Sequence, residues 1–167
     1  MKQEYAPASS GALFSVKVTI TNNTGATVND VKYVRVMDWD VPPTEFNEFV
    51  TIRGTATTTL LEKSHDDGFA SANPLTNSSG SSGTNDTDFT DNGPADHGAY
   101  FRFNFGSLAD GASYDFNIFY GAAASESAAL TAIGAQGLEL YSLGQSNGGE
   151  TTGAPATTRA ARGSWSC

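Results

Sequence analysis

Two segments far apart in the chain carry the pattern that most constrains its fold, a polar turn set beside stretches that alternate with a period of two. In residues 15–20, polar and apolar side chains alternate before the turn residues of 22–25, Asn-Asn-Thr-Gly. In residues 105–120, an Asp-Gly turn precedes aromatic and aliphatic side chains at every second position. Such alternation places successive side chains on opposite faces of a strand, and Asn, Asp and Gly tolerate tight turns. The sequence therefore predicts antiparallel hairpins with one buried face.

Further runs of this kind predict an all-β fold, a two-sheet antiparallel β-sandwich with one short helix near residues 125–136. Phe101, Phe103 and Phe105 share one face of their strand, so their rings are expected to fill the core between the sheets. The helix is expected to begin at Ser125 or Ser127 as N-cap and to stop at Gly137. The expected strands are residues 12–21, 29–38, 47–53, 57–62, 99–105, 113–120 and 137–143.

The two turns also resemble motifs of a known class of proteins. A turn of the T-N-T-G type that ends at Gly25, together with the L-x-x-G-x-S turn of residues 108–113, is similar to small immunoglobulin-like β-sandwich repeats of bacterial secreted and surface proteins. The resemblance covers roughly residues 11–121. It implies an Ig-like sandwich and a secreted, extracellular or cell-surface location.

Charge and cysteine content exclude several classes of partner. The formal net charge is −9, and the nine Lys and Arg residues are scattered, so no patch can neutralise nucleic-acid phosphates or anionic lipids. The one cysteine, Cys167, permits no intramolecular disulfide, which favours bacterial over eukaryotic secretion. No apolar run approaches the roughly 18 residues that cross a bilayer, so no membrane insertion is expected.

The chain divides into three expected parts. Residues 1–10 are expected to be a flexible N-terminus, and residues 11–145 a single β-sandwich domain with a long acidic Gly/Ser-rich loop at 64–98. Residues 146–167 are expected to be a flexible tail whose composition looks non-native. An exposed edge strand of the sandwich would allow self-association.

The densest group of hard oxygen ligands lies in the long loop. Carboxylates at alternating loop positions can converge on one cation, and a glycine such as Gly93 permits a sharp turn. The spacing does not match an EF-hand, and a mobile acidic loop is the alternative. The expected cofactor is calcium, and the expected ligands are Asp86, Asp88, Asp91 and Asp96.

A second acidic group surrounds Trp39. Asp38 and Asp40 flank this indole, and carboxylates beside an exposed indole could bind a carbohydrate by hydrogen bonding and stacking. Two carboxylates are also the apparatus of glycoside hydrolysis, with Glu45 and Glu48 as further candidates. Trp39 is accordingly a candidate ligand contact, and the alternative is an anchor in the core.

Residues 144–148 satisfy the G-x-S-x-G pattern, which would place Ser146 as a nucleophile on a sharp turn. Such a serine needs a base, and His97 is the candidate. A chance match is the alternative, because glycine and serine are frequent here.

Together these features predict an extracellular bacterial β-sandwich module for surface structure, adhesion or glycan binding, stabilised by calcium. Its expected partner is a carbohydrate or a cell-surface component. The alternative is a small hydrolase, either a glycosidase with paired carboxylates or an esterase with Ser146.

Overall fold

The computed structural model describes residues 1–148 and the backbone of residues 161–162. The remainder of the expected tail lies outside the described residues. The fold is all-β with one short helix, as the sequence predicts. The elements in chain order are β1 (Lys2–Pro7), β2 (Leu13–Thr21), β3 (Lys32–Asp38), β4 (Glu48–Arg53), β5 (Leu61–His65), β6 (Phe89–Ala95), β7 (Gly98–Asn104), β8 (Ser113–Ala123), α1 (Glu126–Ala135), β9 (Tyr141–Ser146) and β10 (Ala161–Arg162).

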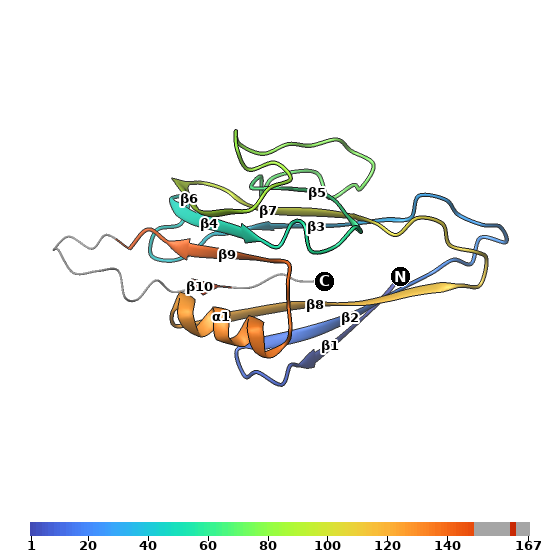
Figure 1. The fold of residues 1–167 in the computed structure, drawn as a ribbon, viewed down its shortest axis with the longest axis horizontal. Coiled ribbons are helices and arrows are strands. Elements are labelled where there is room, and N and C mark those ends of the chain that lie inside the picture. Colours follow the sequence, from blue (N-terminus) through green and yellow to red (C-terminus); the bar gives the residue numbers. More distant parts are fainter. Residues whose placement is uncertain (149–160, 163–167) are drawn as a thin grey trace.

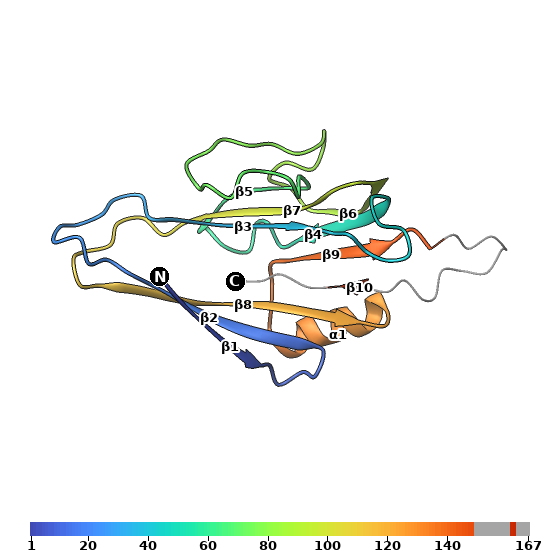
Figure 2. The same ribbon diagram turned by 180° about the vertical axis from the view of Figure 1, so that it is seen from behind.

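Two antiparallel sheets face each other in a sandwich (Figures 1 and 2). The larger sheet has the strand order β1-β2-β8-β10-β9-β4-β6, and the smaller has the order β3-β7-β5. Consecutive strands β3 and β4 lie in different sheets, as do β6 and β7. Loops that join these strands therefore connect the two layers at one end of the sandwich.

The core between the sheets contains the aromatic face that the sequence predicts. Phe101, Phe103 and Phe105 are buried there, and they pack with Val16 and Ile118 of the larger sheet. The prediction that these rings fill the inter-sheet space is confirmed. Burial of such side chains supplies the main favourable free energy for joining the two layers.

The two predicted turns meet in space through Asn22. The side chain of this buried residue donates from Nδ2 to the carbonyl oxygen of Leu108 at 2.8 Å and to that of Ala26 at 2.7 Å. Its backbone carbonyl accepts from the amide of Gly111 at 2.7 Å. One asparagine thus joins two hairpin ends that lie far apart in the sequence.

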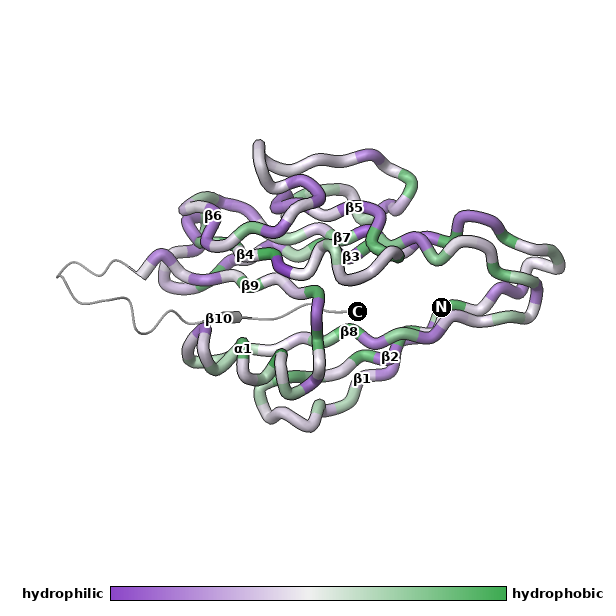
Figure 3. The backbone as a smooth tube through the Cα atoms, in the orientation of Figure 1, coloured by the Kyte–Doolittle hydropathy of each residue, from purple (hydrophilic) through white to green (hydrophobic). Residues whose placement is uncertain are grey.

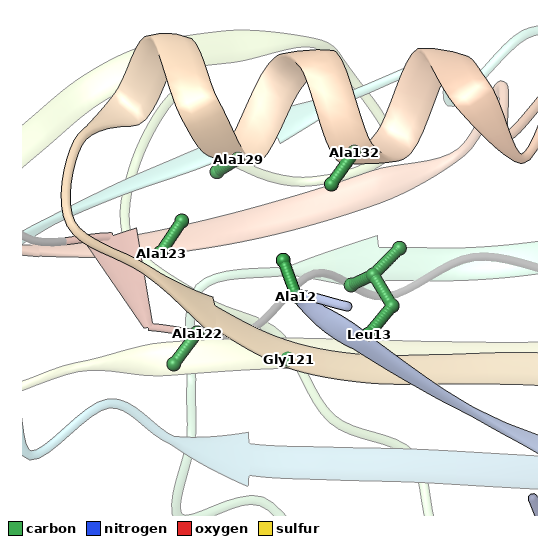
Figure 4. A pocket seen from close by; sticks show the side chains of 7 residues that line it. All are labelled: Ala12, Leu13, Gly121, Ala122, Ala123, Ala129 and Ala132. Atoms are coloured by element: carbon green, nitrogen blue, oxygen red, sulfur yellow. The ribbon is translucent and has the colours of Figure 1, made fainter. Parts of the chain in front are cut away.

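Helix α1 packs against the larger sheet through small side chains. Ser125 is the N-cap and accepts from the Ala128 amide, as expected. Figure 4 shows Ala129 and Ala132 directed from the helix toward Ala12 and Leu13. The cavity that remains there has a volume of about 10 Å³, room for one water at most. Among the described residues, no helix has the length and apolar character that a membrane span requires.

Two strands form where the sequence predicts irregular structure. β1 occupies the expected flexible N-terminus and pairs with β2 along its whole length. Its exposed, mostly polar residues lack the apolar alternation that marks a half-buried strand. β6 lies inside the expected loop of 64–98 and pairs with β4 with shifts of register. Its Asn92-Gly93-Pro94 sequence is typical of a turn. β6 is an edge strand that pairs on one side only, and edge strands tolerate glycine and proline.

The rest of the long loop covers the outer face of the smaller sheet, where it arches over β5 and β7 in Figure 1. Tyr100 faces outward from β7 but is fully buried, and its ring stacks on His65 at 4.3 Å between centroids. His65 also lies within hydrogen-bond distance of Ser78 in the loop. The loop is therefore packed on the sheet rather than a free linker.

Candidate carboxylate site

Four carboxylates meet at the end of the sandwich where the two sheets are connected. Asp38 ends β3 of the smaller sheet, and Asp40 follows it in the loop to β4. Glu48 begins β4 of the larger sheet, and Asp96 lies in the short turn from β6 to β7. The tube in Figure 3 is strongly hydrophilic around β6, at this end of the molecule.

The spacing of these groups suits one calcium ion. One carboxylate oxygen from each residue lies within 4.8 Å of the other three; the four residues are Asp38, Asp40, Glu48 and Asp96. Calcium binds oxygen at about 2.4 Å, so two of its ligands can be separated by up to about 4.8 Å. In the described part of the chain, no other group of three or more acidic, His or Cys side chains converges in this way.

Backbone packing brings Asp38 and Asp96 together. In the register of β3 and β7, Asp38 pairs with Gly98, and the amide of Trp39 donates to the carbonyl oxygen of His97 at 3.3 Å. A side chain at Gly98 would collide with the Met37 carbonyl, so only glycine permits this close approach. Asp96 is thereby fixed beside the end of β3.

Glu48 is the distinctive member of the cluster. Its side chain is fully buried, whereas Asp38, Asp40 and Asp96 are exposed. Its Oε2 accepts from the amide of Asn47 at 2.9 Å, but its Oε1 is buried and has no hydrogen-bond partner. A buried carboxylate oxygen without a donor is unfavourable, and a bound cation would compensate it.

The charges in the cluster oppose one another. Burial raises the pKa of Glu48, and the charges of Asp96 and Asp40 raise it further, although the Asn47 amide and His97 act in the opposite direction. Loss of solvent also raises the pKa of Asp38, and repulsion by Asp40 and Asp96 adds to this shift. Both groups therefore favour protonation more than ordinary carboxyls when no cation is present.

A second buried carboxylate, Asp66, lies close by but has a different environment. Its Oδ1 accepts from the Ser81 amide at 2.7 Å and from Thr84 Oγ1 at 2.9 Å. Its Oδ2 accepts from Asn92 Nδ2 at 2.9 Å and lies 3.3 Å from His97 Nδ1. Burial alone would raise the pKa of Asp66, but the bonds from His97, Ser81 and Thr84 hold it far below its usual range. Asp66 thus fastens the long loop to β6 and β7.

The expected calcium ligands of the long loop are separated in the structure. Asp86 accepts from the Ser64 amide, and Asp88 accepts from the amide and hydroxyl of Thr55. The amide of Asp91 donates to Thr51. Among the described residues, these three aspartates belong to no converging group, and only Asp96 of the expected set does. Asp86 and Asp88 accept instead from residues that are distant in the sequence, which alternating spacing does not reveal.

The Trp39 indole is buried in the core, with 4% of its surface exposed. Its Nε1 donates to Ser142 Oγ at 3.0 Å, and its ring lies where a side chain at Gly144 would be. Its faces are therefore covered by protein, which favours the alternative of a core anchor over a ligand contact. Glu45 is exposed and lies outside the carboxylate cluster.

The G-x-S-x-G segment does not form the turn that a nucleophilic serine needs. Ser146 is buried at the end of strand β9, and Gly144 is explained by its contact with Trp39. His97 is also buried, with Nδ1 near Asp66 and Nε2 3.0 Å from the Glu48 carbonyl oxygen. Because both ring nitrogens face other oxygens, the geometry offers no base for Ser146.

Sequence reasoning named all four members of the cluster but assigned them to two separate groups. No pairing of strands 29–38 and 99–105 was predicted, and it is the pairing of β3 with β7 in the structure that places Asp38 near Asp96. Comparisons of the chain with protein-family models, curated proteins and solved structures find no match. The resemblance to immunoglobulin-like repeats therefore stays a prediction.

Proposed function

We propose that this chain is an extracellular bacterial β-sandwich module that binds a divalent cation, calcium in the simplest case, and serves in surface structure or adhesion. The observation that carries the proposal is the buried Glu48 oxygen, which has no donor and belongs to a cluster of four carboxylates. Hard cations prefer such oxygen ligands, and water would complete the six to eight positions that calcium uses.

Calcium suits the cluster better than magnesium. Magnesium binds oxygen at about 2.0–2.1 Å in a strict octahedron and keeps several waters, so it rarely uses a cage of four protein carboxylates. Calcium accepts irregular geometry and longer distances. Formal charge also favours calcium. Four carboxylates carry more negative charge than either divalent ion can neutralise, so they repel one another, and the larger coordination shell of calcium keeps them further apart.

The cation would connect the two sheets. Asp38 belongs to the smaller sheet, and Glu48 belongs to the larger one. A bound ion would join the layers at the end where β3 leads to β4 and β6 leads to β7. A role in mechanical or thermal stability outside the cell follows, and it agrees with the absence of any disulfide from a chain whose one cysteine is Cys167.

The test is thermal unfolding of the purified protein in excess chelator and in millimolar calcium. A ligand that binds only the folded state stabilises it by about 2.7 kcal/mol at a hundredfold excess over its dissociation constant. We expect calcium to raise the melting temperature of the unmodified protein by several degrees, and Glu48→Gln to abolish this rise. Magnesium at the same concentration should have a smaller effect.

The matched control is Glu45→Gln, which removes the same charge from an exposed position three residues away. This variant should keep the full response to calcium. An unchanged melting temperature on addition of calcium, or an equal loss of response in both variants, would refute the cation site.

A further inference from the structure

An open cavity of about 210 Å³ adjoins the carboxylate cluster. Asp96, a member of the cluster, and its neighbour His97 form one side. The rest of the lining comes from the long loop and includes Asp67, Phe69, Ser79 and Ser81. The cavity is smaller than the roughly 300–1,000 Å³ of sites for drug-sized ligands, which suits a single ring rather than an extended chain.

Phe69 gives this cavity an aromatic wall. The side chain is 62% exposed, although phenylalanine is usually buried. Its backbone is fixed, because the Phe69 amide donates to Asp67 Oδ1 at 2.9 Å. Asp66 accepts bonds from Ser81 and Thr84, and these bonds hold the part of the long loop that contributes Ser81 to the cavity lining.

The polar side chains of the lining are hydroxyls, carboxylates and the His97 imidazole. Ser79 and Ser81 supply hydroxyls, Asp67 supplies a carboxylate acceptor, and neither Lys nor Arg lines the cavity. An anionic ligand would be repelled by these carboxylates and by the net charge of −9. A neutral ligand with many hydroxyl groups meets no such penalty.

We infer that the cavity binds one residue of a neutral saccharide, with a sugar face against Phe69 and a pair of neighbouring hydroxyls on the cation held by the cluster. The inference depends on the proposed cation site. Three of the four carboxylates are exposed, so the ion would keep positions open toward solvent and the cavity. A sugar ring offers an apolar C–H face and hydrogen-bonding edges at once, which matches an aromatic wall beside polar groups.

The experiment is binding of the fluorescently labelled protein to an array of neutral glycans in calcium and in excess chelator. We expect retention on at least one glycan in calcium, with at least a tenfold loss in chelator. Phe69→Ala should lose retention by at least tenfold while keeping the calcium-dependent rise in melting temperature. Phe46→Ala is the matched control, since Phe46 is similarly exposed, at 65%, and does not line the cavity.

The outcomes separate the two proposals. A calcium-dependent rise in melting temperature without retention on any neutral glycan would overturn the saccharide site and leave the cation site standing. Retention that survives chelator, or that Phe46→Ala and Phe69→Ala reduce equally, would also overturn it. Retention on polylysine in place of neutral glycans would show that the acidic cavity takes a cationic partner.

Discussion

Two buried carboxylates, Asp66 and Glu48, lie near the same end of the sandwich and have opposite surroundings. Asp66 accepts hydrogen bonds at both oxygens from the long loop and from β6. Glu48 accepts one bond from its neighbour Asn47, and its other oxygen has no donor. The pKa of Asp66 is lowered, against the effect of burial, because hydrogen bonds stabilise its charged form. The pKa of Glu48 is raised, mainly by burial.

The difference separates a structural role from a binding role. A carboxylate that is fully supplied with donors has no capacity for a further ligand, and its charge stabilises the fold. A buried carboxylate that lies close to three others, with one oxygen lacking a donor, destabilises the fold until a cation binds. Burial alone would not distinguish these residues, since both are almost completely inaccessible to solvent.

Asp66→Asn should give the largest effect on stability. The side-chain NH2 group of the variant would face N–H or O–H groups that now donate to Asp66, so some of these bonds would be lost. The buried network would also lose its negative charge. We expect a loss of about 3 kcal/mol in the free energy of unfolding, measured by urea denaturation at neutral pH. The effect should be the same in calcium and in chelator, because Asp66 belongs to no cation site in the described residues.

Asp67→Asn is the control for that substitution. Asp67 is only partly buried, and its carboxylate accepts from the amide of Phe69. A loss of less than about 1 kcal/mol is expected, as for most changes near the surface. If both variants lose equal stability, Asp66 does not have the structural role assigned to it.

Strand periodicity predicted most of the sandwich, because apolar alternation reports directly on a half-buried strand. Segments such as Leu13–Thr21 and Gly98–Asn104 carry that signal, and the helix was located by its Ser125 cap. β1 carried no such signal, since an exposed edge strand is held by backbone bonds rather than by side-chain burial. β6 was not predicted because it contains Gly93 and Pro94, which are typical of turns.

The site was harder to predict because its members come from distant segments. Sequence spacing grouped Asp96 with Asp86 and Asp88, whereas the fold separates them and places Asp96 beside Asp38 and Glu48. Trp39 shows the same limit. Its acidic neighbours suggested an exposed indole, but at the end of β3 Asp38 and Asp40 are exposed while the ring between them is buried.

Glu48→Gln, measured in chelator, should have the opposite sign to Asp66→Asn. Removal of one negative charge relieves repulsion in the cluster, and the new amide can donate to the neighbouring carboxylates while its oxygen still accepts from Asn47. We expect a gain of roughly 1 kcal/mol in the free energy of unfolding without calcium. In saturating calcium the variant should instead be less stable than the unmodified protein. A loss of stability in chelator would show that the Glu48 charge is already compensated within the fold.

The pH dependence in chelator should give the smallest effect and the sharpest distinction. The pKa values of Glu48 and Asp38 are raised by folding, so their contribution to stability is fully present below about pH 4, the ordinary pKa of such groups, and is lost as pH rises through the raised values. The pKa of Asp66 is lowered, so its contribution is present above about pH 4 and is lost as pH falls further.

Between pH 5 and 7, the free energy of unfolding measured in urea should therefore decline by on the order of 1 kcal/mol or less. Asp66→Asn should retain this decline, and Glu48→Gln should reduce it. Calcium should reverse the slope, because the ion binds the deprotonated carboxylates. A stability that rises between pH 5 and 7 in chelator, equally in the unmodified protein and in Glu48→Gln, would contradict the opposition between the two carboxylates.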